Sequence, residues 1–415
     1  MRIFRVGWFL AVRQIKRSGI WTTLLIIFIM SLTFLNLVVI GGVLVGLPIG
    51  STIAYNHQYS GDVILRNLPT KEYIEQSDSI VRTIASFPEV EAVSVRFIGF
   101  GHVEANYRTR VGPNQSPDSV NAAITGINPS NENNVTHMGD LLLEGSMLRD
   151  GEEGFVMIGK NLLDEYTLGP AVVSATTLRG VHAGSRVRVV IGEYSKEYIV
   201  KGVLGAKVNE VSTRVFMTNT ELRRLLGRTD RNVDEIAVRL WDEQQSLRVR
   251  DDLRALGFDS YALVETSRES QGTFIDDIER TFVILSSIIG GIGLIVASIT
   301  VFIVIFINAV SRQKYIGILK GIGISAGAIE LSYVLQSIFY ALIGSTIGLL
   351  VVYGLLEPYF STHPIDFPFA DGVLLVPVDG TFFKAGLLVL VTIIAGYLPA
   401  RMIVGRNTLD AILGR

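Results

Sequence analysis

Residues 20–46 read IWTTLLIIFIMSLTFLNLVVIGGVLVG and residues 281–311 read TFVILSSIIGGIGLIVASITVFIVIFINAVS, and neither stretch contains a charged side chain. Residues 331–356 are also uncharged, and residues 385–400 form a shorter uncharged stretch. About 20 apolar residues are enough to cross the hydrocarbon core of a bilayer, so the first three stretches are long enough and the fourth is marginal. The sequence therefore predicts four transmembrane helices.

These helices are unevenly spaced, because more than half of the 415 residues lie between the first and the second. This one-plus-three layout predicts that a large domain outside the bilayer works together with the helices. The predicted segments are an amphipathic N-terminal helix at 1–19, the first span at 20–50, an extracytoplasmic domain at 51–276, spans at 281–310, 329–356 and 382–404, a cytoplasmic helical segment at 311–328, an outer loop at 357–381 and a cytoplasmic tail at 405–415.

The distribution of charge predicts the orientation. The first 19 residues hold five basic side chains and no acidic one, whereas the outer loop at 357–381 holds four acidic side chains and no basic one. Because cytoplasmic segments carry an excess of Lys and Arg, both termini and the 311–328 segment are predicted to be cytoplasmic and the large domain to face outward. The cytoplasmic basic residues that decide this are Arg2, Arg5, Arg13, Lys16, Arg17, Arg312, Lys314 and Lys320.

The predicted N-terminal helix has a basic side. On a helical wheel, Arg2, Arg5, Arg13 and Lys16 fall within about 80° of one another, with most of the apolar residues opposite. Such a helix lies in the membrane interface with its basic side toward anionic headgroups. The alternative is that these charges only orient the first span and have no separate role.

The segment from 61 to 261 has the pattern of a mixed α/β domain. Strand-helix-strand patterns occur at both of its ends, and short β-like runs bounded by Gly or Asn fill the middle. We predict two lobes, with a β-rich inner lobe at about 112–230 inserted into an α/β lobe built from both ends. The predicted helices are 70–87 and 244–256, and the predicted strands are 62–65, 90–97, 120–127, 154–158, 184–191, 197–204, 214–217, 235–241 and 261–264.

Motifs for catalysis and metal binding are missing from the sequence. Residues 154–161, GFVMIGKN, come close to a phosphate-binding loop, but Asn161 replaces the Ser or Thr that holds magnesium and the intervening residues suit a strand. The five histidines have no metal-ligand spacing, and the absence of cysteine excludes thiol chemistry. No ionisable residue lies in the middle of a predicted span, unlike in ion-coupled transporters. We therefore predict no catalytic, cofactor or metal site on this chain.

Small and polar residues inside the predicted spans indicate close helix packing. Small-residue sides are predicted at Gly290, Gly291, Gly293 and Ala297 in the second span and at Gly344 and Gly348 in the third. Such patterns favour tight contact between helices over a pore. Asn36 and Gln336 are the main strongly polar residues in the spans, and hydrogen bonds between helices explain them.

The segment 311–325, SRQKYIGILKGIGIS, is a predicted cytoplasmic loop that is short and yet apolar. Ile316, Leu319 and Gly323 have helical spacing, with Arg312 and Lys320 around them. Apolar side chains in such a loop need a surface to cover them, and a helix of this kind fits a groove of a cytoplasmic partner. The alternative is an interfacial turn that lies on the membrane.

Residues 316–325, IGILKGIGIS, resemble the cytoplasmic coupling helix of the ABC transporter permease family of the MacB, FtsX and LolC/LolE type, whose pattern is close to EIGILKALGAS. Tyr315 stands where the family usually has an acidic residue, and Gln336 stands near a position where the third span often has Glu. Residues 398–401 and 407–412 resemble the family's C-terminal pattern without its second proline. Residues 125–129, 139–145 and 155–163 look like the lipoprotein-releasing branch.

This resemblance implies a fold and a function. The implied fold is an α-helical membrane protein with four transmembrane helices and a large mixed α/β extracytoplasmic domain of two lobes. The implied function is that of a permease subunit in a bacterial inner membrane, without enzymatic activity of its own, which binds membrane lipids and forms a dimer with a second copy or a paralogue. It does not imply nucleic acid as a partner.

The resemblance also implies how such a permease works. A separate cytoplasmic ABC ATPase binds ATP and Mg, and its closure is passed through the helices to the outer domains, which move or release a lipoprotein or other amphipathic substrate. This is called mechanotransmission. The alternative is an FtsX-like regulator that activates an extracytoplasmic partner such as a cell-wall hydrolase. The implied ATPase-coupling residues are Tyr315, Ile316, Gly317, Ile318, Leu319, Lys320, Gly321, Ile322 and Gly323.

Overall fold

The computed structural model describes residues 2–108, 118–166, 177–367, 370–372 and 374–405. The chain divides into two compact units. The membrane unit consists of Met1–Ile49, Asp276–Asp366 and Asp371–Arg415, and the outer unit consists of Gly50–Ile275 and Phe367–Ala370. The C-terminal pattern predicted at 407–412 lies outside the described residues.

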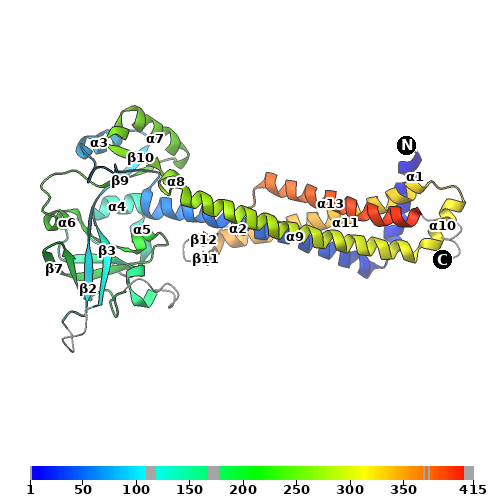
Figure 1. Cartoon of the computed structure of the whole chain (residues 1–415), viewed down its shortest axis with the longest axis horizontal. Coiled ribbons are helices and arrows are strands. Elements are labelled where there is room, and N and C mark those ends of the chain that lie inside the picture. The colour runs from blue at the N-terminus through cyan, green and yellow to red at the C-terminus, as the bar shows by residue number, and fades with distance from the viewer. Residues whose placement is uncertain (1, 109–117, 167–176, 368–369, 373, 406–415) are drawn as a thin grey trace. The chain divides into compact units, whose positions relative to one another are not determined.

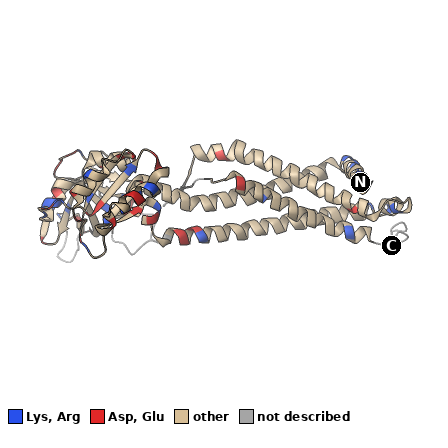
Figure 2. Cartoon of the chain, turned by 90° about the horizontal axis from the view of Figure 1, so that it is seen from above, with Lys and Arg blue, Asp and Glu red and all other residues tan. Residues whose placement is uncertain are grey.

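Four helices are long and apolar enough to cross a membrane, namely Ile20–Ser60, Ile275–Ser311, Ala326–Thr362 and Val378–Val404. They confirm the four predicted spans. Charged side chains are nearly absent from the middle of these long helices (Figure 2). The long apolar helices and the short helices that adjoin them are α1 (Arg2–Arg17), α2 (Ile20–Tyr55), α9 (Thr273–Ser311), α10 (Gln313–Gly321), α11 (Ala326–Val351), α12 (Glu357–Thr362) and α13 (Val378–Val404). A π-helical turn at Val352–Leu356 precedes α12.

Glycines allow the spanning helices to approach one another closely. A Cβ built on Gly344 of α11 would lie 2.5 Å from the Cβ of Met30 on α2, which is closer than real Cβ atoms come. A Cβ on Gly293 of α9 would lie 3.0 Å from the amide oxygen of Asn36 on α2. The predicted small-residue sides of these helices are thus confirmed as packing surfaces, except at Gly291, where a Cβ would meet no atom within 4 Å.

The charged residues inside the predicted spans, Glu330, Lys384 and Arg401, all lie within a few residues of a span end. Lys384 occupies the second turn of α13 and is half-buried. A Cβ on Gly41 of α2 would lie 2.8 Å from its Nζ, so glycine leaves the space that the ammonium group uses. A long lysine side chain near the end of a span can keep its charged group at the interface while its methylenes remain in apolar surroundings.

The outer unit is built on one mixed sheet with the strand order β10-β1-β9-β2-β3-β8-β5-β7-β4, and β6 pairs with β2 and β7. The long strand β2 pairs with β9 from Val90 to Arg96 and with β3 from Phe97 to Ala105. The strands are β1 (Val63–Asn67), β2 (Val90–Ala105), β3 (Asp118–Ile127), β4 (Leu142–Gly145), β5 (Phe155–Gly159), β6 (Arg186–Ile191), β7 (Tyr194–Leu204), β8 (Arg214–Thr218), β9 (Glu235–Leu240) and β10 (Ala262–Thr266), and a separate short pair is β11 (Ile365–Phe367) and β12 (Ala370–Gly372).

These strands include all nine that the sequence predicts, with ends that differ by a few residues except in β2, which continues to Ala105. The near-phosphate-loop at 154–161 is confirmed as strand and turn, since β5 is followed by a 3-10 turn at Lys160–Leu162. The outer unit is compact as a whole, and β2 runs through both parts of the sheet. The division into two lobes therefore stays a prediction.

Two helices pack their apolar sides against the β1–β10 end of the sheet, α3 (Ser77–Ile84) and α7 (Ser246–Ala255) (Figure 1). The prediction of one helix over 70–87 was wrong at its start. The N–H of Ile74 donates to the Val233 carbonyl at 2.8 Å, and this isolated bridge lies among the turns and bends that precede α3. The remaining helices of the unit are α4 (Pro129–Thr136), α5 (Asn209–Ser212), α6 (Asn219–Leu225) and α8 (Ser267–Ser270).

Candidate coupling site

The segment that carries the family motif folds as the short helix α10, and its end is fixed by backbone geometry. Gly323 has a φ of +93°, a conformation that glycine adopts without strain. Its N–H donates to the Lys320 carbonyl and the N–H of Ile324 donates to the Leu319 carbonyl, both at 3.0 Å. This pair of bonds is a Schellman motif, which satisfies the last carbonyl groups of a helix. The turn between α10 and α11 therefore explains why a glycine stands at position 323.

The inner side of α10 packs on the membrane unit itself. Ile316 is only 2% exposed and belongs to the apolar cluster of the spanning helices, and Leu319 packs against the same cluster. The Nζ of Lys320 donates at 2.9 Å to the carbonyl group of Val404, the last residue of α13. A cation is stabilised at this end of a helix by the helix dipole. α10 is thus attached to the spanning helices by apolar packing and by the charged hydrogen bond of Lys320.

The outward side of α10 carries a different set of residues. Tyr315, Ile318 and Ile322 are 69%, 51% and 70% exposed, and their spacing of three and four residues puts them on one side of the helix. Gly321 has open space where a side chain would be. Sequence spacing selected Ile316 and Leu319 for docking, but the structure turns both inward. The sequence pattern indicated an apolar stripe on this helix, but it did not indicate which surface covers the stripe.

The helix α1 covers part of the neighbouring α11. A Cβ on Gly7 would lie 3.0 Å from Leu331, and Ala11 is buried in the same contact. The amide of Gln336 on α11 donates to the side-chain oxygen of Gln14 on α1, which confirms the predicted role of Gln336 as a hydrogen-bonding residue between helices. Part of the apolar side of α1 is therefore used within the chain, and its placement in the membrane interface stays a prediction.

In the outer unit, a buried group of charges surrounds Arg96 of β2, which is 1% exposed. Its Nη2 lies 2.7 Å from Glu132 Oε1 and its Nη1 lies 3.1 Å from Glu235 Oε2. Arg96 also donates to the Tyr59 carbonyl, and its guanidinium carbon lies 4.7 Å from the centre of the Tyr59 ring. Arg214 adds a second cation, 3.5 Å from Glu235 Oε1. Such a network is stabilising only when every charge has its partners.

This network fixes the protonation state of Glu235. Burial by itself would raise the pKa of this carboxyl group, but Arg214 and Arg96 together with the Tyr59 hydroxyl bring the pKa below its ordinary value. The contribution of Glu235 to stability is therefore present at neutral pH. It is lost only when the pH falls through that lowered pKa.

A second buried contact lies where α2 ends. Asp62 accepts hydrogen bonds from the N–H of Leu240 and from the Asn56 side chain, both at 2.8 Å. Arg239 lies 3.3 Å from Asp62 and donates to the Asn56 side-chain oxygen at 2.6 Å. Both networks have one signal in the sequence, because Arg96 and Arg239 each stand between two large apolar residues of a strand. A charged residue at such a position needs a buried partner.

The structure also brings together three residues that sequence spacing kept apart. Ligand atoms of Glu144, Glu165 and His182 lie within 4.8 Å of one another. Glu144 already accepts hydrogen bonds from the Tyr166 hydroxyl and from the N–H of Ala183. His182 and Glu165 are exposed. Because these groups satisfy one another at the surface, we assign no metal to them.

Comparison with known proteins agrees with this architecture. Residues 23–256 match the model of the MacB-like periplasmic core domain, and residues 287–408 match the model of the FtsX-like permease C-terminal region. The periplasmic region of MacB from Actinobacillus actinomycetemcomitans, a solved structure, is 13% identical, with a TM-score of 0.34 over 51% of this chain and 90% of that one.

Two curated relatives align over parts of the chain. The macrolide export ATP-binding/permease protein MacB of Burkholderia cenocepacia is 26% identical over 194 residues, which is 46% of this chain and 27% of that protein. An uncharacterized ABC transporter permease, YknZ of Bacillus subtilis, is 27% identical over 115 residues, which is 25% of this chain and 29% of that protein. The chain thus spans less than a third of the length of these relatives.

The domain match at 23–256 alone covers more than half of the chain, and the second match covers the three later spans and α10. The chain belongs to the ABC transporter permeases of the MacB/FtsX type, which carry a MacB-like periplasmic core domain and an FtsX-like permease region.

Proposed function

We propose that the chain is a transport subunit that works by mechanotransmission. A separate cytoplasmic ABC ATPase binds ATP and Mg, docks on α10, and drives the movement or release of a lipoprotein or other amphipathic substrate by the outer unit. The observation that carries this proposal is the outward side of α10, where Tyr315, Ile318 and Ile322 are exposed while the opposite side is attached to the spanning helices. A helix held in this way passes a force to the helices behind it.

The path of that force follows contacts within each unit. Lys320 connects α10 with the end of α13, and Ile316 packs on the apolar cluster shared by the spanning helices. The helix α2 is continuous from Ile20 to Tyr55, and the next residues, 56–60, take part in the buried charge networks of the outer unit. We propose that this path makes the outer unit respond to α2, and that two lobes of the outer unit move relative to each other.

A second function is not favoured. The FtsX-like regulator that activates a cell-wall hydrolase remains the alternative from another class, but the relative from Burkholderia cenocepacia is named for macrolide export. Copurification of the tagged chain from its native membrane with a nucleotide-hydrolysing ATPase, followed by release of an amphipathic compound from proteoliposomes, supports transport. Hydrolase activation without release of any such compound would support the regulator instead.

Orientation gives a direct prediction, because a chain without cysteine allows single-cysteine labelling without background. We propose that α10 is cytoplasmic and that the outer unit is periplasmic or extracellular. Leu256→Cys, in the outer unit, should react with a membrane-impermeant maleimide on intact spheroplasts. Lys314→Cys, on α10, should react only after permeabilisation. The reverse pattern of labelling would end the proposed coupling mechanism.

Dimer formation is proposed to use α9, the least covered of the four spans. Only 22% of its most apolar stretch is buried within the chain, against 44% for the first and fourth spans. Seven isoleucines recur along it at intervals of three or four residues and are between 48% and 62% exposed. A second copy or a paralogue that packs on this stripe would cover it. The seven are Ile284, Ile288, Ile292, Ile295, Ile299, Ile303 and Ile307.

The stripe predicts a cross-linking pattern in native membranes. Ile295→Cys should form a cross-linked dimer, with another copy or with a paralogue that carries the matching cysteine. The control is Leu390→Cys on α13, which is also exposed but lies outside the stripe, and which should stay monomeric. Cross-linking of the α13 variant without that of the α9 variant would assign the interface to the other side of the bundle.

A further inference from the structure

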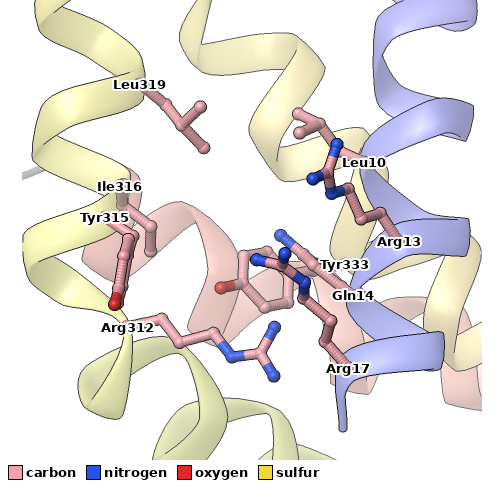
Figure 3. Close-up of a pocket in the computed structure, with 9 residues that line it drawn as sticks. All are labelled: Leu10, Arg13, Gln14, Arg17, Arg312, Tyr315, Ile316, Leu319 and Tyr333. Atoms are coloured by element: carbon pink, nitrogen blue, oxygen red, sulfur yellow. The ribbon is translucent and has the colours of Figure 1, made fainter.

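A cavity of about 310 Å³ lies between α1, α10 and α11, inside the membrane unit (Figure 3). Its wall combines three arginines, three other polar side chains and three apolar residues. It shares only Tyr315 with the outward side of α10 described above, and the rest of its α10 wall is formed by the inward residues Ile316 and Leu319. The lining residues are Leu10, Arg13, Gln14, Arg17, Arg312, Tyr315, Ile316, Leu319 and Tyr333.

The positive charge of this cavity has no counterpart in the wall. Arg13 and Arg17 come from successive turns of α1, and Arg312 precedes α10 (Figure 3). No carboxylate is among the described residues that line the cavity. None of the three guanidinium groups forms an ion pair or a hydrogen bond with another described side chain; Arg13 only lies near the ring of Phe9. Three like charges around one space repel one another until an anion enters it.

A buried hydroxyl group points to the same ligand. Tyr333 of α11 is 1% exposed, and its hydroxyl has no hydrogen-bond partner within the described part of the chain. Figure 3 places this ring between the side chains of α1 and those of α10. Buried hydroxyl groups are nearly always satisfied, so an unpaired one in the wall of a cavity indicates a ligand that accepts a hydrogen bond from it. Several arginines with a hydroxyl donor are a typical set for a phosphate group.

The rest of the wall indicates that the ligand is not a free phosphate. Leu10, Ile316 and Leu319 contribute apolar surface to the cavity. On α1, Ile3, Phe4, Trp8 and Phe9 are between 54% and 59% exposed, and these are side chains that insert between lipids when such a helix lies in an interface. A ligand with an anionic phosphate and an apolar body fits both parts of the wall.

We propose that this cavity binds the phosphate of an anionic phospholipid of the cytoplasmic leaflet. The proposal rests on the orientation proposed above and goes beyond the coupling mechanism, because it makes the position of α10 depend on the lipid. A headgroup held by Arg17, Arg312 and Tyr333 connects α1, the start of α10 and α11. The bilayer then acts as a third partner of the coupling helix, beside the ATPase and the spanning helices.

The test measures lipid binding to the purified full chain. Phosphatidylglycerol or phosphatidylcholine is added, and the bound lipid is detected by native mass spectrometry. The native chain should retain phosphatidylglycerol in preference to phosphatidylcholine. The triple variant Arg13→Gln, Arg17→Gln, Arg312→Gln should lose this preference, with at least a tenfold weaker apparent affinity for phosphatidylglycerol. Tyr333→Phe removes one oxygen and keeps the packing, and it should weaken binding by a smaller factor, severalfold.

The matched control is Arg5→Gln, Lys16→Gln, which removes two charges from the same helix without touching the cavity. It should keep the preference of the native chain. An equal loss in this control would mean that only the general charge of α1 attracts lipid and would overturn the proposal. Equal retention of phosphatidylglycerol by the native chain, the triple variant and Tyr333→Phe would also overturn it.

Two further arms separate the sources of the anion. Inorganic phosphate that displaces phosphatidylglycerol at millimolar concentration would identify a soluble phosphate as the occupant and would overturn the choice of lipid. A triple variant that binds phosphatidylglycerol normally but no longer copurifies with the ATPase would assign the cavity to an acidic group of that protein. Labelling of position 314 decides the orientation independently, so failure of the lipid site and failure of the coupling mechanism are distinguishable.

Discussion

Arg96→Met is expected to destabilise the outer unit by about 3–5 kcal/mol, because it leaves two buried carboxylates without their shared cation. Glu132 loses both of its bonds to the guanidinium group, and Glu235 keeps the hydrogen bond from the Tyr59 hydroxyl but only the more distant Arg214 as a cation. A domain is stable by about 5–15 kcal/mol in total, so this loss is a large fraction of the whole. Hydrogen–deuterium exchange of the full chain in detergent measures it on peptides from β2 and β9, which should exchange much faster in the variant.

The control for this prediction is an ion pair at the surface. Arg108 contacts Glu197, and both side chains are well exposed. Solvent screens such a pair, so Arg108→Met should leave exchange in β2 and β9 unchanged. If Arg96→Met exchanges like the native chain, then the buried network is not needed for stability and water must reach Glu132 and Glu235.

Ile318→Asp should abolish stimulation of the ATPase while leaving the permease folded. The side chain of Ile318 is half exposed in the free chain, so aspartate there costs little before the partner binds. In a partner's groove the carboxylate would lose its water, which costs several kcal/mol and weakens binding by about 100-fold or more. Gly321→Trp should have the same effect through a steric clash, since the space beside Gly321 is open in the free chain. ATP hydrolysis by the copurified complex is the measurement.

A matched control is Leu256→Asp, the same chemical change at an exposed apolar residue of the outer unit. It should leave both copurification and hydrolysis unchanged. Ile316→Asp is not an equivalent test, because Ile316 is buried among the permease's own helices and its loss damages the fold. Normal stimulation by both Ile318→Asp and Gly321→Trp would remove α10 as the docking helix.

The spans and most strands could be predicted from the sequence, because each depends on a local pattern. An uncharged stretch such as 281–311 has one stable environment, and the alternation in 90–97 suits a half-buried strand. The helix predicted from residue 70 failed because Ile74 pairs with Val233, a residue far away in the chain. Local spacing contains no information about such a distant partner.

The candidate site shows the same limit. The sequence pattern of 311–325 predicted a helix with an apolar stripe, and α10 has one. It could not predict that Ile316 faces α1 and α11, because the surface that covers a stripe depends on the tertiary arrangement. The cavity was not predictable for the same reason, since Arg17 and Arg312 are distant in the chain and meet only after folding.

The long strand β2 has a mechanical consequence for the outer unit. It is the only strand in the described sheet that pairs with β9 along one half and with β3 along the other. Gly99 and Gly101 follow directly after the change of partner, and a Cβ on Gly101 would lie 2.2 Å from the Val190 carbonyl oxygen. Any torsion between the two halves of the sheet must therefore be absorbed by β2, close to Arg96. Because Arg96 lies on this same strand, a twist of the sheet at that point would also change the distances within the ionic network.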